Sequence, residues 1–149
     1  MRILFVCLGN ICRSPSAEAV MRDLIEREGV EGFVIDSAGT GDWHVGKPAD
    51  SRAIAAAADR GVTITSTARQ VRPEDFSEFD LILAMDRANR DSLLAMEAAD
   101  PGRVHLFREL AGEGELDVPD PYFGDDGGFG EVLDILERGS ITVLDGLRN

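Results

Sequence analysis

The chain has 149 residues, with 15 lysines and arginines against 28 aspartates and glutamates, and so carries a formal net charge of −13 at pH 7. The length predicts one domain over residues 1–149 with a sizeable core, and the charge argues against nucleic acid or an anionic membrane as a partner. Two cysteines and two histidines are too few for a disulfide framework or a recognisable zinc site.

The first segment predicts a buried strand, a tight loop and the start of a helix. Residues 3–6 read Ile-Leu-Phe-Val, an apolar run that suits a strand covered on both faces. Ser14-Pro15 is typical of a helix N-cap followed by proline at the first helical position. A loop that leads into a helix N-terminus can turn its backbone N–H groups inward, and the helix dipole adds to their attraction for phosphate or another oxyanion. We therefore expect an oxyanion site in this loop.

Cys7 stands at the start of the loop and is interpreted as a nucleophile. Inward N–H groups, the helix dipole and a nearby guanidinium all stabilise a thiolate, and Arg13 can hold two phosphate oxygens with its planar fork. Gly9 and Asn10 both tolerate the positive φ that a curled loop needs. Ser14 has two possible roles, to cap the helix or to donate to the Cys7 sulfur. The alternative is a buried structural cysteine before an ordinary capped helix.

The next elements are predicted from apolar spacing and small residues. The helix after the loop ends at Gly29, residues 33–35 form a second strand, and residues 36–41 form a small-residue turn close to the loop. Trp43 follows in a glycine-bounded loop, where it either walls an aromatic substrate or caps the edge of the core. His44 is interpreted as a polar loop residue. Residues 50–60 are rich in alanine and predict a helix that approaches the sheet closely.

The second half continues the alternation of strands and helices. Residues 81–85 predict a third strand, and Asp86 caps a helix that extends to about residue 98. Residues 104–107 predict the fourth strand, residues 111–128 a long functional loop, and residues 129–147 a final helix interrupted by Gly139. This pattern predicts an α/β fold of three layers, with a central four-stranded parallel sheet flanked by helices.

The segment Cys7-Leu-Gly-Asn-Ile-Cys-Arg-Ser-Pro15 resembles the C-x5-R-S phosphate loop of the low-molecular-weight protein tyrosine phosphatases. The second cysteine inside the loop, Cys12, makes the match more specific than C-x5-R alone. Further matching stretches are residues 36–40, 42–46, 68–70, 85–86 and 120–122. One departure is Ser66, which stands where many members carry a histidine that helps to hold the loop asparagine.

The resemblance implies hydrolysis of phosphotyrosine in a protein substrate, without a metal or an organic cofactor. Cys7 would form a phospho-cysteine intermediate, and Asp120 in Asp-Pro-Tyr would be the general acid and base. Asp117, Asp125 and Asp126 would only solvate that loop. By position in the family, Ser37 would hydrogen-bond Asn10, and Asp86 would support the site. The residues expected to bind the substrate are Leu8, Gly9, Asn10, Ile11, Cys12, Ser14, Trp43 and Tyr122.

Two alternatives stay open beside this function. An arsenate reductase uses a similar loop and fold, although such enzymes normally pass oxidation to further cysteines, and none follows Cys12. A phosphopeptide-binding module without turnover is disfavoured by Cys7, Arg13 and Asp120.

We also expect Cys12 to protect Cys7 from oxidation, against the alternative that it only packs behind the loop. The apolar run at residues 3–8 is too short for the core of a signal peptide, so a cytoplasmic protein is expected.

Overall fold

Strand β1 (Arg2–Cys7) lies inside the sheet and carries the site at its carboxyl end. The computed structural model describes residues 1–123 and 127–148. Within them β1 pairs with β2 (Val34–Gly39) on one side and with β3 (Leu81–Ala84) on the other, and β4 (Val104–Leu106) lies beyond β3. All three pairings are parallel, in the order β2-β1-β3-β4. The predicted central four-stranded parallel sheet is therefore confirmed.

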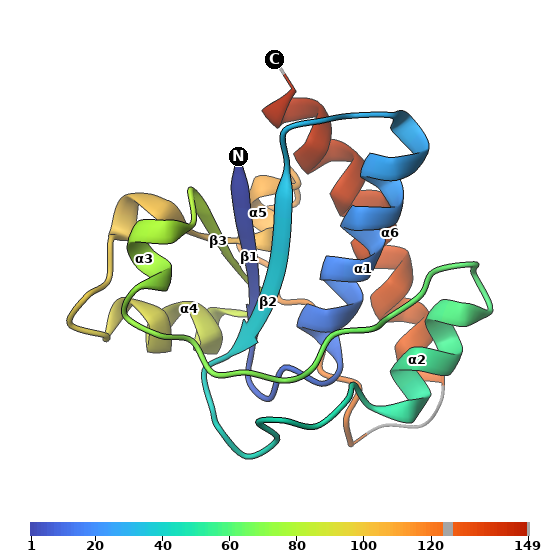
Figure 1. The fold of residues 1–149 in the computed structure, drawn as a ribbon, viewed down its shortest axis with the longest axis horizontal. Helices are drawn as coiled ribbons and strands as arrows, with labels where there is room; N and C mark the ends of the chain where they lie inside the picture. Colours follow the sequence, from blue (N-terminus) through green and yellow to red (C-terminus); the bar gives the residue numbers. More distant parts are fainter. Residues whose placement is uncertain (124–126, 149) are drawn as a thin grey trace.

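Helices cover both faces of this sheet, which gives the three predicted layers (Figure 1). Helices α1 and α6 cover one face, and the short α3 and α4 lie over the other. The helices are α1 (Arg13–Glu28), α2 (Ser51–Ala58), α3 (Asp75–Glu78), α4 (Arg87–Leu94), α5 (Phe107–Leu110) and α6 (Gly127–Leu147), with a 3-10 turn η1 (Pro101–Arg103). No helix within the described ranges is both long and apolar enough to cross a membrane.

The two faces of β1 belong to two separate core clusters. Ile3 and Phe5 pack in the cluster that contains the apolar residues of α1 and α6, whereas Leu4 and Val6 pack with residues around α3 and α4. All four side chains are fully buried. This explains why the strand is apolar at every position instead of alternating.

Several predicted boundaries are wrong, and packing explains two of them. Residues 36–39 belong to β2 and not to a turn, because they continue the ladder to the pair Cys7↔Gly39. A Cβ atom at Gly39 would lie 2.8 Å from the Leu8 carbonyl oxygen, so this strand end must be small. Helix α6 is not interrupted at Gly139, where a Cβ atom would lie 2.5 Å from the Phe107 ring.

The other differences concern helix ends and neighbours. Helix α2 makes its main contacts with α6 and α1, whereas the expected close approach was to the sheet. Helix α4 ends at Leu94, before residue 98, because the next turn is closed by a tighter bond from Met96 N to Leu93 O. Phe107 begins α5 and does not extend β4. Helix α1 ends as predicted, with Gly29 in the left-handed region at φ 64°.

Candidate active site

The phosphate loop, defined as residues 8–12, connects the end of β1 to the start of α1. Asn10 has φ 56°, as expected for a residue that curls the loop. Among the described residues it is the only one other than glycine with a positive φ. Gly9 does not share this conformation; its small size matters because a Cβ atom there would lie 3.0 Å from Cδ2 of His44. The prediction that Ser14 is the N-cap is wrong, since Cys12 occupies that position without a side-chain cap.

The Cys7 sulfur makes hydrogen bonds with the phosphate loop and with the first turn of α1. The backbone N–H of Asn10 donates to Sγ at 3.3 Å, and the Ser14 hydroxyl oxygen lies 3.0 Å from Sγ. Ser14 is the second residue of α1, so the geometry supports contact with the sulfur instead of helix capping. Both interactions suit a thiolate acceptor, which argues against a merely structural cysteine.

The Asn10 side chain braces the loop from behind. Its amide nitrogen donates to Ser14 Oγ at 2.8 Å and to Ser37 Oγ at 3.0 Å, while its oxygen accepts from the Arg69 backbone N–H at 3.0 Å. Both amide atoms therefore have partners, although Ser66 stands where the histidine was expected. The Asn10 and Ser14 side chains are buried and do not line the pocket, so any contact of Asn10 with a bound oxyanion would come from its backbone N–H.

Glu18 extends this network into the protein and was missed by the sequence analysis. The Ser37 hydroxyl donates to Glu18 Oε1 at 2.6 Å, and Arg22 pairs with Oε2 at 2.8 Å. Burial raises the pKa of Glu18, and the bonds from Ser37 and Arg22 oppose this effect. A chain of contacts thus connects a buried carboxyl group to the nucleophile through Ser37 and the loop. The sequence signal that could have identified Glu18 is its spacing, because Glu18 follows Ser14 by one helical turn and precedes Arg22 by another.

Arg13 is buried beside the pocket and aimed by two acceptors. Its Nη1 atom donates to Asp86 Oδ2 at 2.6 Å and to the Val118 carbonyl at 3.0 Å. Burial lowers the pKa of Arg13, but the neighbouring Cys7 and Asp86 raise it by a larger amount. The net shift in this pKa is upward, so the guanidinium stays charged. Asp86 also accepts from Asn89 N at 2.7 Å, which confirms its predicted role as the N-cap of α4.

Asp120 and Asp117 lie on the same loop but have different partners. Asp120 Oδ2 lies 3.6 Å from Arg13 Nη2, and Oδ1 accepts from the Tyr122 backbone N–H at 3.1 Å. Asp117 is held by Arg87, which donates to it from its backbone and from its side chain at 2.9 to 3.2 Å. These bonds from Arg87 lower the pKa of Asp117. A carboxyl group with a lowered pKa is a poor candidate for a proton donor. Asp125 and Asp126 lie outside the described residues.

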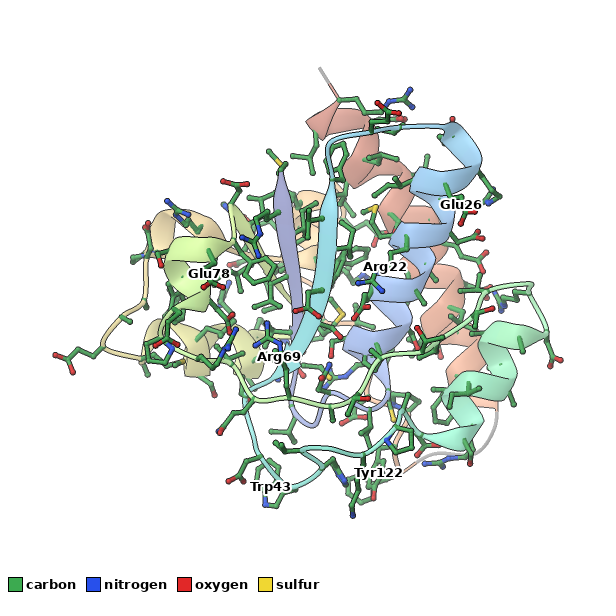
Figure 2. All side chains as sticks on the ribbon, in the orientation of Figure 1. Arg22, Glu26, Trp43, Arg69, Glu78 and Tyr122 are labelled. Atoms are coloured by element: carbon green, nitrogen blue, oxygen red, sulfur yellow. The ribbon has the colours of Figure 1, made fainter. Side chains whose placement is uncertain are left out.

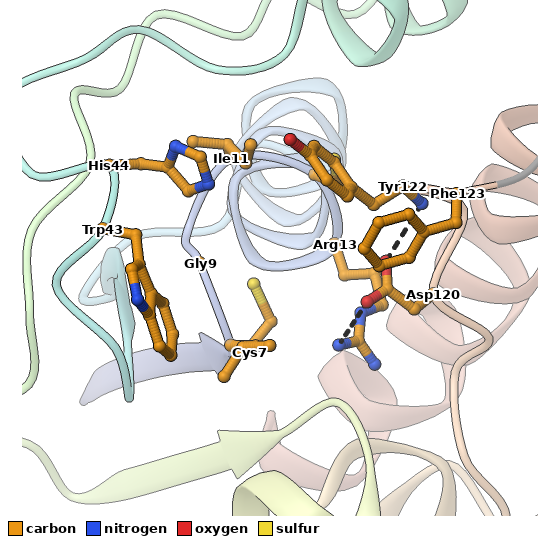
Figure 3. A pocket seen from close by; sticks show the side chains of 11 residues that line it. Cys7, Gly9, Ile11, Arg13, Trp43, His44, Asp120, Tyr122 and Phe123 are labelled. Carbon is orange, nitrogen blue, oxygen red and sulfur yellow. Dashed lines mark hydrogen bonds and ion pairs between the residues drawn. The ribbon is translucent and has the colours of Figure 1, made fainter.

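Cys7, Arg13 and Asp120 meet in one pocket at the carboxyl ends of the strands (Figure 3). Trp43 and Tyr122 lie at the same end of the molecule, below the sheet (Figure 2), and face each other across the Cys7 sulfur. Trp43 is 66% exposed, so it does not cap the core. The lining residues are Cys7, Leu8, Gly9, Ile11, Cys12, Arg13, Trp43, His44, Asp120, Tyr122 and Phe123. His44 and Phe123 were not predicted to line the pocket, because one reads as a polar loop residue and the other as an ordinary neighbour of Tyr122.

Cys12 lines the pocket and also belongs to the core cluster behind the phosphate loop. Burial, followed by the charges of Asp50 and Cys7, raises the pKa of Cys12 to about 12. At neutral pH Cys12 is therefore held as a thiol in the resting protein. Across residues 1–123 and 127–148, no group of three or more His, Cys, Asp or Glu side chains gathers in a way that could hold a metal ion.

Comparison with known proteins gives one family for the whole chain. Residues 2–149 match the model of the low molecular weight phosphotyrosine protein phosphatases. A low molecular weight protein-tyrosine-phosphatase of Streptomyces coelicolor is 46% identical over 154 residues, covering 99% of this chain and 93% of the relative.

Solved structures agree with this match. A protein tyrosine phosphatase from Entamoeba histolytica, crystallised with Hepes in its active site, aligns with a TM-score of 0.93 at 40% identity and covers 99% of this chain and 97% of its own. A Drosophila arginine phosphatase aligns with a TM-score of 0.90 at 29% identity and covers 100% of this chain and 99% of its own.

Proposed function

The chain belongs to the low molecular weight phosphotyrosine protein phosphatase family and is a phosphatase, and we propose that it hydrolyses protein phosphotyrosine and other aryl phosphates through a phospho-cysteine intermediate on Cys7. The observation that carries this proposal is that Cys7 and Arg13, at the two ends of the phosphate loop, meet Asp120 from a distant part of the chain in one pocket. A thiolate, a phosphate-binding guanidinium and a carboxylic acid are the groups that the reaction needs.

In the first step the Cys7 thiolate attacks phosphorus. A sulfur–phosphorus bond forms while the bond from phosphorus to the phenolic oxygen breaks, and the electron pair leaves with that oxygen. Asp120, protonated at this stage, gives its proton to the leaving phenoxide. Arg13 and the backbone N–H groups of the loop hold the non-bridging oxygens, where negative charge concentrates in the transition state.

In the second step water releases the phosphate. Asp120, now a carboxylate, takes a proton from the attacking water, and the new phosphorus–oxygen bond displaces the Cys7 sulfur as a thiolate. Inorganic phosphate leaves, and the enzyme returns to its starting state. Ser14 Oγ lies 3.0 Å from the sulfur and stabilises the thiolate as it departs.

The walls of the pocket support an aryl substrate. Ile11, Trp43, Tyr122 and Phe123 surround the Cys7 sulfur with apolar and aromatic surface. A phenyl ring can lie between Trp43 and Tyr122 while its phosphate reaches the loop, which a phosphoserine of shorter reach cannot do with the same contacts. The expected partner is therefore a phosphotyrosine-containing protein, with phosphate in the loop as the product.

Oxidation control by Cys12 is a separate part of the proposal. A sulfenic acid on Cys7 would react with the Cys12 thiol to form a disulfide and water, which protects Cys7 from irreversible oxidation. Cys12 lines the same pocket as Cys7, and this position supports the reaction. A thiolate nucleophile of this kind also suits a reducing compartment, so the proposed location is the cytoplasm.

Hydrolysis of 4-nitrophenyl phosphate and of a phosphotyrosine peptide tests the proposed function directly. We expect turnover of both, and arsenate reduction and phosphoarginine hydrolysis are measured in parallel. Faster arsenate reduction, or release of phosphate from phosphoarginine alone, would contradict the proposal. Binding of the phosphopeptide without release of phosphate would identify a binding module instead.

A further inference from the structure

Arg52 connects the two loops of the pocket without lining it. It lies in the first turn of α2, and its Nη2 atom donates both to Asp50 Oδ2 at 2.9 Å and to the Tyr122 carbonyl at 3.0 Å. Asp50 is in turn fixed to the phosphate loop, because its backbone N–H donates to the Ile11 carbonyl at 2.8 Å. A continuous set of bonds therefore runs from the phosphate loop through Asp50 and Arg52 to Tyr122.

The same residue, Tyr122, holds the side chain of Asp120. The Tyr122 backbone N–H donates to Asp120 Oδ1 at 3.1 Å, while its carbonyl accepts from Arg52. A shift of the Tyr122 main chain would therefore move the Asp120 carboxyl relative to the phosphate loop. Asp120 is partly exposed, and the cation that pairs with it among the described residues is Arg13, whose Nη2 lies 3.6 Å away.

The Arg52 guanidinium itself is well fixed. Its central carbon lies 4.9 Å from the ring centroid of Phe129 on α6 and 5.7 Å from that of Tyr122. Asp50 Oδ1 accepts from its Nε at 3.1 Å, which completes a two-point contact with the carboxylate. A planar guanidinium can make these stacked and forked contacts together, whereas a lysine ammonium cannot.

We propose that Arg52 is a positioning residue that holds Asp120 within reach of the leaving group by fixing the Tyr122 main chain. This inference rests on the proposed function, in which Asp120 protonates the leaving oxygen. General acid catalysis depends on hydrogen-bond distance, and a displacement of about 1 Å can cost on the order of 100-fold in rate. The effect of Arg52 should therefore be large only where the leaving group needs the proton.

The experiment measures kcat/KM for wild type and Arg52→Gln with aryl phosphates whose phenols range from strongly activated to unactivated. Because kcat/KM reports the steps through cleavage of the phosphorus–oxygen bond, it is sensitive to protonation of the phenol. We expect Arg52→Gln to lose about 10- to 100-fold with the poorest leaving group and less than about threefold with the most activated one. With the poorest leaving group, the kcat/KM of Arg52→Lys should fall between that of wild type and that of Arg52→Gln, because one ammonium cannot keep both sets of contacts.

Arg60→Gln is the matched control. Arg60 follows α2 and also ties this region to α6, by donating to the Gly130 carbonyl at 3.0 Å and to Asp134 at 2.7 Å. It does not contact Tyr122 or the phosphate loop in any of the bonds that it makes to described residues. The dependence of its kcat/KM on the leaving group should match that of wild type, which separates positioning of Asp120 from general loosening of α2.

The double variant Arg52→Gln/Asp120→Ala decides whether Arg52 acts through Asp120. If it does, the double variant should have the same kcat/KM for the poorest leaving group as Asp120→Ala alone. An equal loss with all phenols, no loss, or losses that multiply in the double variant would overturn the inference. Failure of wild type to hydrolyse any aryl phosphate would instead overturn the proposed function, so the two failures are distinguishable.

Discussion

The guanidinium of Arg13 and the carboxylate of Asp86 form an ion pair in which Nη1 lies 2.6 Å from Oδ2, with the Arg13 side chain 3% exposed. This contact, together with the bond to the Val118 carbonyl, directs the remaining face of the guanidinium toward the pocket. Arg13 thus enters the site already oriented, so little conformational entropy is lost when phosphate binds.

We expect Arg13→Lys to lower kcat/KM for aryl phosphates by about 100-fold or more, in the range found when one transition-state donor is removed. A lysine can contact one phosphate oxygen but cannot bond Asp86 and two oxygens in the same plane. Steady-state kinetics measure the loss, and melting temperature serves as the control for folding. Kinetics equal to those of wild type would place Arg13 outside the reaction.

Cys7→Ser should abolish hydrolysis while phosphate binding remains measurable by calorimetry. The backbone N–H groups of the phosphate loop and Arg13 are unchanged in this variant, but a serine hydroxyl is a far weaker nucleophile than a thiolate. Turnover at the wild-type rate would end the assignment of Cys7. Loss of both binding and folding would show that the sulfur is needed for the shape of the loop.

Asp120→Ala should slow cleavage of a poor leaving group by about 100-fold or more, as is typical of general acid catalysis. An activated phenol should be affected much less, because it leaves without a proton. The matched control is Asp117→Ala, which removes a carboxylate on the same loop that is bound by Arg87. A larger loss in Asp117→Ala than in Asp120→Ala would show that the acid is misassigned.

Cys12→Ser should leave initial turnover nearly unchanged but make peroxide damage irreversible. Wild type treated with peroxide should regain activity with a thiol reductant, and mass spectrometry should detect the loss of two hydrogens from an intramolecular disulfide. Burial raises the pKa of Cys12 to about 12, so Cys12 is a thiol in the resting protein. Equal recovery in both proteins would support the alternative that Cys12 only packs behind the loop.

Glu18→Gln tests the buried end of the network through the pH dependence of stability. Burial raises the pKa of Glu18 in the folded protein above its ordinary value of about 4.3. Its favourable contribution is therefore fully present below that ordinary value and is lost as pH rises through the folded pKa. The free energy of unfolding of wild type minus that of the glutamine variant should decrease in urea titrations as pH rises above about 4.3. An increase over this range would contradict the raised pKa.

Much of the fold and the centre of the site follow from local sequence. The apolar run at residues 3–6 predicted a strand buried on both faces because side chains alternate between faces at every residue. Cys7 and Arg13 could be placed together because a strand, a short loop and a helix start bring them to one anion site without help from the rest of the chain. Asp86 could be identified as a cap for the same reason, since its partner Asn89 is three residues away.

Residue types alone did not distinguish Asp120 from Asp117, and resemblance to a family was needed to choose between them. The structure separates the two by their partners, since Arg87 binds Asp117 while Asp120 lies 3.6 Å from Arg13. Arg87 belongs to the helix that Asp86 caps, so this distinction depends on how β3 and α4 are placed beside the loop. No spacing within residues 111–123 contains that information.

The sequence by itself determined the alternation of elements, the parallel sheet and the strand-loop-helix unit that carries Cys7, because these depend on side-chain periodicity and on neighbours along the chain. Only the tertiary structure decided the partners of Glu18 and Arg52 and the need for glycine at position 139. Each of these depends on a contact across the fold, to Ser37, to Tyr122 and to Phe107 respectively. Helical periodicity says which face of a helix is covered, but the partner on that face is chosen by the packing of distant segments.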